Sequence, residues 1–111
     1  MINKEELLQK IPKLLDELKN KNPLTHCITN FVTVNDCANA VLAIGASPIM
    51  SEDIEEVAEV VSIADALVIN IGKLSHEQVE AMKVSSAQAN KINTPVILDP
   101  VGVGISQLRN K

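Results

Sequence analysis

Aromatic side chains are almost absent from this sequence of 111 residues, which has one phenylalanine, Phe31, and neither tryptophan nor tyrosine. Proteins that bind single-stranded nucleic acid usually stack the bases on aromatic rings, and this sequence offers almost none. A basic excess is missing as well, because 14 acidic residues outnumber 10 basic ones and the formal net charge is −4. Both features argue against a dedicated nucleic-acid-binding protein, and they predict a core of aliphatic side chains.

Long apolar runs and paired metal ligands are also missing. No apolar run reaches the roughly 18 residues that a membrane-spanning helix needs. The N-terminus, MINKEELLQK, has acidic residues where a signal peptide is apolar. Cys27 and Cys37 stand ten positions apart, without a CxxC motif or paired histidines, so we expect buried free thiols rather than a disulfide or a zinc site. These features predict a cytoplasmic protein that does not act at a membrane.

Helical and strand patterns alternate along the chain. Apolar residues at helical spacing predict helices over residues 3–19, 31–44, 53–64 and 75–91. Short segments next to helix breakers predict strands over 24–28 and 47–50, and short apolar runs predict strands over 66–69 and 96–98. This order predicts an α/β fold in which a parallel sheet with right-handed crossovers carries helices on its faces.

Local signals mark several helix ends. They are capping-box spacings at Asn3 with Glu6 and at Ser75 with Gln78, a capping serine at Ser51, and a left-handed terminal glycine at Gly45. Pro12 lacks an amide proton, so we expect it to kink or split the first helix near Lys10.

Small, polar or flexible residues dominate the positions that follow the four predicted strands, where an open parallel sheet binds its ligands. They are Thr29, Asn30, Met50, Ser51, Asn70, Gly72, Asp99, Pro100, Gly102 and Gly104. Because turns favour many of these residue types for backbone reasons alone, the pattern by itself leaves open whether this rim is a binding site. His26 lies within the first strand and is expected to be a hydrogen-bonded, partly buried ring.

The segment DPVGVG, residues 99–104, is the most specific part of this rim. A carboxylate at a strand tip can hold Mg²⁺, and glycines let backbone amides approach phosphate oxygens, as phosphoryl transfer requires. The sequence lacks the Walker A pattern GxxxxGK[ST], and its GxG lacks the third glycine of a dinucleotide-binding motif.

Four sequence blocks together resemble the N-terminal half of the hydroxyethylthiazole kinase family, within the ribokinase superfamily. They are PLTHCITN at 23–30, AIGASPIM at 43–50, VINIG at 68–72 and VILDPVGVG at 96–104. The resemblance covers about residues 22–109. It implies that residues 1–111 are the N-terminal part of a single domain with the three-layer α/β/α ribokinase-like fold, here incomplete.

The resemblance implies ATP-dependent phosphorylation of the hydroxyl of 4-methyl-5-(2-hydroxyethyl)thiazole, with Mg²⁺, as a step of thiamine salvage. By position, the family's thiazole-pocket residues correspond to Met50, Asn30, Val32 and Gly72, and its phosphate and metal residues to Asp99, Gly102, Gly104 and Arg109, with Asp99 as the metal ligand. Met50 alone is equally compatible with a core position, but a polarizable thioether also packs well against an aromatic heterocycle.

The family is well over twice as long as this sequence. Its ATP-contacting arginine and threonine and its catalytic cysteine lie beyond Lys111, so the resemblance implies that this chain holds no catalytic residue and is inactive alone. The family's thiazole pocket forms between the subunits of a homotrimer, which implies a trimer surface here. The alternative function is a non-catalytic thiazole-binding or subunit-interaction module.

Overall fold

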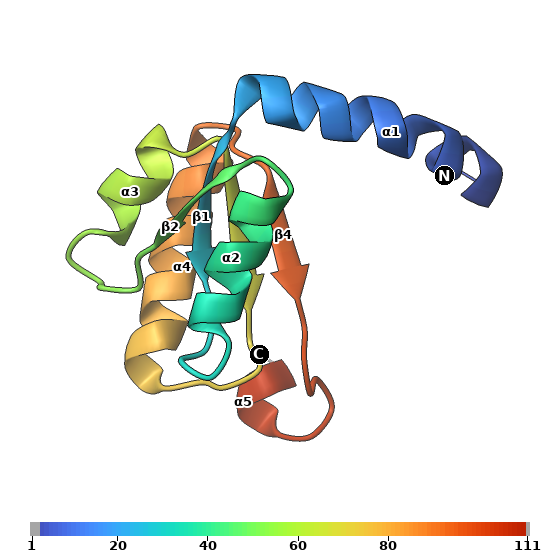
Figure 1. The fold of residues 1–111 in the computed structure, drawn as a ribbon. Coiled ribbons are helices and arrows are strands. Elements are labelled where there is room, and N and C mark those ends of the chain that lie inside the picture. Colours follow the sequence, from blue (N-terminus) through green and yellow to red (C-terminus); the bar gives the residue numbers. More distant parts are fainter. Residues whose placement is uncertain (1–2, 111) are drawn as a thin grey trace.

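A computed structural model describes residues 3–110, which form a parallel sheet flanked by helices (Figure 1). The elements are, in order, α1 (Lys4–Lys21), β1 (Leu24–Ile28), α2 (Val34–Ala43), β2 (Ser47–Met50), α3 (Val57–Ile63), β3 (Ala66–Asn70), α4 (His76–Lys91), β4 (Val96–Asp99) and α5 (Gln107–Asn110). The four strands lie in the order β2-β1-β3-β4, and every neighbouring pair is parallel. The predicted α/β architecture is therefore confirmed.

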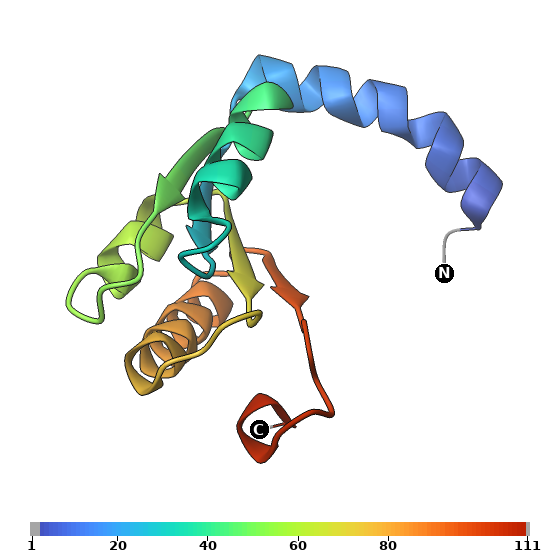
Figure 2. The same cartoon turned by 60° about the horizontal axis from the view of Figure 1, so that its bottom comes forward.

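The helices cover both faces of the sheet. The chain steps from β1 outward to β2 and then returns past β1 to β3 and β4. Because crossovers between parallel strands are right-handed, this change of direction requires the helices to lie on opposite sides. Figure 2 shows α2 on one face and α3 with α4 on the other.

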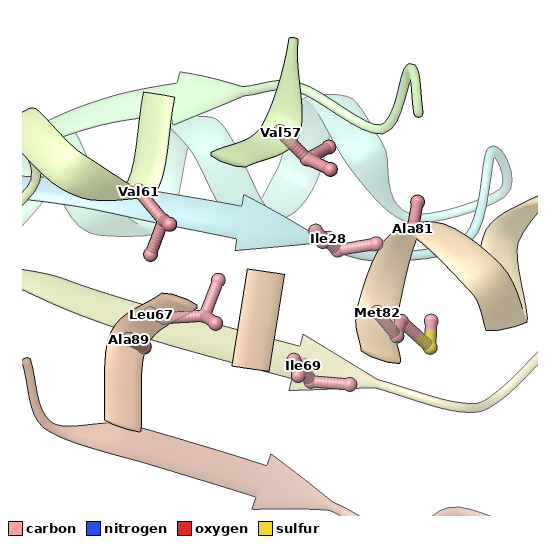
Figure 3. Packing of buried hydrophobic residues seen from close by; sticks show 8 residues of the cluster. All are labelled: Ile28, Val57, Val61, Leu67, Ile69, Ala81, Met82 and Ala89. Carbon is pink, nitrogen blue, oxygen red and sulfur yellow. The ribbon is translucent and has the colours of Figure 1, made fainter. Parts of the chain in front are cut away.

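The core lies between the sheet and the pair α3 and α4 (Figure 3). It consists of Ile28, Val57, Val61, Leu67, Ile69, Ala81, Met82 and Ala89. None of these side chains is aromatic, as predicted from the scarcity of aromatics. In contrast, the apolar residues of α1 remain largely exposed, as with Leu8 at 56%. Within the described part of the chain, a helix with the length and apolarity to cross a bilayer is absent.

The predicted helix ends are confirmed at three places. The side chain of Asn3 accepts a hydrogen bond from the amide of Glu6 at 2.9 Å, and that of Ser75 accepts one from Gln78 at 3.1 Å. Gly45 follows α2 with a φ of +102°, a conformation that favours glycine. The sequence predicted a kink or a split at Pro12; α1 is not split but forms one continuous helix, which bends along its length (Figure 2). Since α1 is exposed along its length, water can satisfy the carbonyl that lacks an amide partner at the proline.

The third helix begins later than predicted, at Val57 rather than Asp53. The side chain of Asp53 accepts a hydrogen bond from the amide of Glu55 at 2.9 Å, which forms a local turn in place of the first helical residues. Ser51 does not cap this helix, since its hydroxyl donates to the carboxylate of Glu56 at 2.6 Å.

Candidate active site

The carboxyl ends of all four strands lie along one edge of the sheet, because the strands are parallel. The register pairs Cys27 with Met50 and Asn70 with Asp99. The candidate residues that end or follow the strands, from Met50 on β2 to Asp99 on β4, therefore share one rim (Figure 1). We refer to this edge as the strand-tip rim.

Three of the candidate binding residues are joined through Asn70, a strand-end residue for which the sequence predicted no role of its own. The amide Nδ2 of Asn30 donates to Oδ1 of Asn70 at 3.3 Å, and Nδ2 of Asn70 donates to Oδ2 of Asp99 at 2.8 Å. The backbone amide of Gly72 also donates to Oδ1 of Asn70, at 2.8 Å. The structure thus brings Asn30, Gly72 and Asp99 together. The sequence predicted that Asn70 lies at the end of a strand, but no sequence pattern indicated which residues it contacts.

Asn30 also organises the turn that follows β1. Its side chain is buried, and its Oδ1 accepts hydrogen bonds from the amides of Val32 and Thr33 at 3.1 and 3.2 Å. The candidate Val32 is therefore held at the rim by its backbone, while its side chain is 69% exposed. Gly72 leaves room for the neighbouring amides, because a Cβ there would lie 2.9 Å from both Asn30 Nδ2 and Asn70 Oδ1.

A small cavity of about 120 Å³ adjoins Met50 at this rim. Its lining residues are Cys27, Thr29, Phe31, Val34, Met50, Ser51 and Glu52. Burial raises the pKa of the Cys27 thiol, and the neighbouring Cys37 raises it further. Cys27 is therefore a neutral thiol at neutral pH, and the carboxyl group in the lining of this cavity is that of Glu52. Both cysteines are free, as predicted, although Cys37 is only half-buried.

The catalytic position of the family stays a prediction. The resemblance places its cysteine beyond Lys111, and Lys111 itself lies outside the described residues. Among those described, Cys27 lies on β1, which β3 separates from β4 and from Asp99 at its end. One strand therefore separates Cys27 from Asp99.

His26 anchors the backbone directly after Met50. Its ring is fully buried, more deeply than predicted, and Nε2 lies 2.7 Å from the carbonyl oxygen of Ser51. A carbonyl only accepts hydrogen bonds, so Nε2 carries the proton. Nδ1 is buried without a partner among the described residues. Burial lowers the pKa of His26, and this effect exceeds the opposing influence of the Ser51 carbonyl and of Glu56.

Gln78, near the start of α4, ties together the loops that follow β1 and β2. Its Nε2 donates to the carbonyl of Thr29 at 3.1 Å and to the carboxylate of Glu52 at 2.8 Å. The side chain predicted to complete a capping box with Ser75 is thus used for contacts far away in the sequence. Lys73 and Phe31 line the same pocket as Gln78, and Lys73 Nζ lies 3.9 Å from the centre of the Phe31 ring.

Arg109 holds the glycine loop that follows β4, residues 100–104, against the segment that follows β3. Its guanidinium donates to the carbonyl oxygens of Gly72 and Val101, each at 2.9 Å, and to that of Ile71. Gly102 and Gly104 adopt φ values of +73° and +94°, which side chains rarely tolerate. Arg109 is therefore engaged with backbone carbonyls, so its contribution next to a phosphate would be its positive charge and its support of the loop.

Carboxylates that could hold a metal are sparse at this rim. The described residues contain no group of three or more His, Cys, Asp or Glu side chains arranged for an ion. Asp99 is exposed at the end of β4. Mg²⁺ is commonly held by one or two carboxylates together with water and substrate phosphates. Asp99 could therefore serve as one protein ligand of a magnesium ion whose other ligands are water and phosphate oxygens.

Comparisons with known proteins agree on one family. The model of the hydroxyethylthiazole kinase family matches residues 15–111. A hydroxyethylthiazole kinase of Methanobrevibacter smithii is 94% identical over all of this chain, which covers 39% of that protein. One from Clostridium beijerinckii is 57% identical over 95% of this chain and 38% of its own length. A solved hydroxyethylthiazole kinase structure from Pyrococcus horikoshii superposes with a TM-score of 0.88 and 44% identity, over 91% of this chain and 40% of that one. The chain therefore spans about two fifths of these relatives.

Proposed function

We propose that this chain, which belongs to the hydroxyethylthiazole kinase family, supplies the thiazole-binding side of an enzyme that phosphorylates the hydroxyl of 4-methyl-5-(2-hydroxyethyl)thiazole with ATP. The observation that carries this proposal is the connected rim. A small cavity whose lining includes Met50, the neutral thiol of Cys27 and the carboxyl group of Glu52 lies at one end. A hydrogen-bonded chain from Asn30 to Asp99 leads from there to the carboxylate at the other end.

The cavity beside Met50 suits an uncharged heterocycle. The Met50 thioether can pack against the face or edge of the thiazole ring, which is worth about 0.3–1.5 kcal/mol for sulfur–aromatic contacts. The Cys27 thiol is held neutral by its raised pKa, so it does not repel an electron-rich ring. We propose that the same ligand also contacts two neighbouring segments. These are the turn after β1, with Asn30 and Val32, and the backbone after β3, with Gly72.

Asp99 and the glycine loop are proposed to face the phosphates. When bound, Mg²⁺ would neutralise phosphate charge, and Asp99 is the side chain here that would hold it. Gly102 and Gly104 keep the loop backbone accessible, and Arg109 anchors this loop while adding positive charge. Neither cysteine of this chain fits a catalytic role. Cys27 has a raised pKa, and Cys37 Sγ contacts the hydroxyl of Thr29 at 3.8 Å.

Phosphoryl transfer is proposed to need residues that the family has beyond the position of Lys111, namely its ATP-contacting residues and its catalytic cysteine. The 111 residues alone should therefore bind the thiazole alcohol without phosphorylating it. In the family arrangement, exposed apolar residues on α1 and β4, such as Leu8 and Ile97, would be covered within the complete subunit or a homotrimer. A kinase that consumes ATP would work in the cytoplasm.

A chimera tests this proposal. This chain replaces the matching two fifths of the Methanobrevibacter smithii relative, and product formation from the thiazole alcohol and Mg-ATP is measured against the unaltered relative as the positive control. We expect turnover within about twofold of that relative, since few positions differ, and no turnover from the 111-residue chain alone. A folded chimera without turnover would contradict the proposal. If that chimera still bound the thiazole alcohol in calorimetry, the non-catalytic binding module would be favoured instead.

A further inference from the structure

We propose that Asn70 is a positioning residue that fixes Asn30, on the thiazole side of the rim, relative to Asp99, on the phosphate side. This inference rests on the function proposed above. Strand order gives Asn70 this place, because β3 lies between β1 and β4. A side chain at the end of β3 can therefore reach the ends of both neighbours. Since β1 and β4 are not adjacent, a link between their ends has to pass through β3.

The contacts of Asn70 require an amide side chain. An amide has one oxygen that accepts hydrogen bonds and one nitrogen that donates them. Here Oδ1 accepts from the Gly72 backbone at 2.8 Å and from Asn30 at 3.3 Å, while Nδ2 donates to Asp99 at 2.8 Å. The opposite orientation would turn the nitrogen toward two other donors and the oxygen toward a carboxylate. The surroundings thus select a single orientation of the amide.

The bond to Asp99 is the one with the largest consequence. Asp99 is exposed, and without a fixed partner its carboxylate would be free to turn in solvent. Hydrogen bonds to charged groups are stronger than those between neutral groups, so Asn70 restricts the direction in which Asp99 presents its second oxygen. Under the proposed function, the other carboxylate oxygen of Asp99 would meet the metal ion or phosphate.

The chimera described above provides the test, through Asn70→Asp. This change keeps the size of the side chain and its acceptor oxygen for Asn30 and Gly72, but it replaces the donor to Asp99 by a second carboxylate. We expect kcat/KM for the thiazole alcohol to fall about 10- to 100-fold, the effect of losing a hydrogen bond to a charged group. Both kcat and KM should change, because the residue holds both sides of the site. Asn90→Asp, at an exposed position on α4, is the matched control and should leave the kinetics within about twofold.

The exchanged pair Asn70→Asp with Asp99→Asn separates positioning from the chemistry of Asp99. In this double variant the hydrogen bond between positions 70 and 99 is restored with its polarity reversed. We expect KM for the thiazole alcohol to return to within about twofold of the parent chimera, while kcat stays low because the carboxylate at position 99 is gone. A residue with only a general structural role would not produce this split between KM and kcat.

Melting temperatures of the parent, the two single variants and the exchanged pair provide a readout that is independent of activity. Asn70→Asp should lower the melting temperature, and the exchanged pair should recover most of the loss. The proposal is overturned if Asn70→Asp leaves both KM and kcat within about twofold of the parent, or if the exchanged pair restores neither KM nor stability. An inactive parent chimera would instead refute the proposed function. In that case, recovery of stability would support the hydrogen-bonded link through Asn70, and additive losses would overturn it.

Discussion

Mild acid should destabilise this protein through His26. The ring is fully buried, donates from Nε2 to the Ser51 carbonyl, and has an unpartnered Nδ1. Protonation would place a second N–H, and a positive charge, where the described residues offer no acceptor. Folding therefore disfavours the charged ring, in agreement with the lowered pKa of His26.

The direction and size of the effect follow from this lowered pKa. The imidazole of the unfolded chain takes up its proton near pH 6.5, whereas that of the folded chain does so only at lower pH. Between the two values the unfolded chain binds the additional proton, so the free energy of unfolding decreases as the pH falls. The limiting slope for one proton is about 1.4 kcal/mol per pH unit. Above about pH 8 both states are neutral, and this contribution to the slope vanishes.

Urea unfolding at several pH values between 7.5 and 5, about the range in which histidine titrates, measures the effect. His26→Gln keeps an N–H that can reach the Ser51 carbonyl but does not titrate, so the difference between parent and variant isolates this ring from the carboxylates. His76→Gln, at an exposed position on α4, controls for the loss of one imidazole. We expect the stability curves of parent and His26→Gln to converge or cross as the pH falls below about 6.5. Parallel curves over the whole range would refute the reasoning.

Three further substitutions test the cavity, the core and the rim. Met50→Leu keeps the volume of the side chain but removes its sulfur, so KM for the thiazole alcohol should rise about 2- to 10-fold in chimera kinetics; an unchanged KM would argue against a ring contact. Leu67→Ala, at a fully buried position, should lower the free energy of unfolding in urea by about 2–5 kcal/mol, whereas Leu8→Ala on exposed α1 should change it by less than about 0.5 kcal/mol; equal losses would contradict the assigned core. Gly72→Ala introduces a Cβ 2.9 Å from two side-chain amide atoms, so it should lower the melting temperature and raise KM for the thiazole alcohol. An unchanged melting temperature and KM would show that the neighbouring amide side chains can move aside.

The strand positions were predictable because β3 and β4 are short apolar runs and because helix breakers bound the short segments that form β1 and β2. Capping residues likewise fixed the starts of α1 and α4, since these contacts span only three residues. The start of α3 was missed because the Asp53 side chain can bond to the backbone of a turn as readily as it can begin a helix. The spacing of apolar residues does not distinguish a turn of this kind from the first residues of a helix.

The links within the site were less predictable than its location. Parallel topology placed Asn30, Gly72 and Asp99 at one edge of the sheet, but the hydrogen bonds through Asn70 join residues 40 and 29 positions apart. Gln78 likewise contacts Thr29 at a separation of 49 residues. Such contacts depend on strand order, which the sequence does not state. Periodicity alone therefore finds the rim but not the side chain at its centre.

A crystal structure of the chimera with the bound thiazole alcohol is the most direct test of the account. We predict that the thiazole ring lies in van der Waals contact with the Met50 side chain. The hydroxyl group should point along the rim toward Gly72 and Asp99. Electron density for the ligand at the opposite edge of the sheet, or at the rim with its hydroxyl directed away from Asp99, would contradict it.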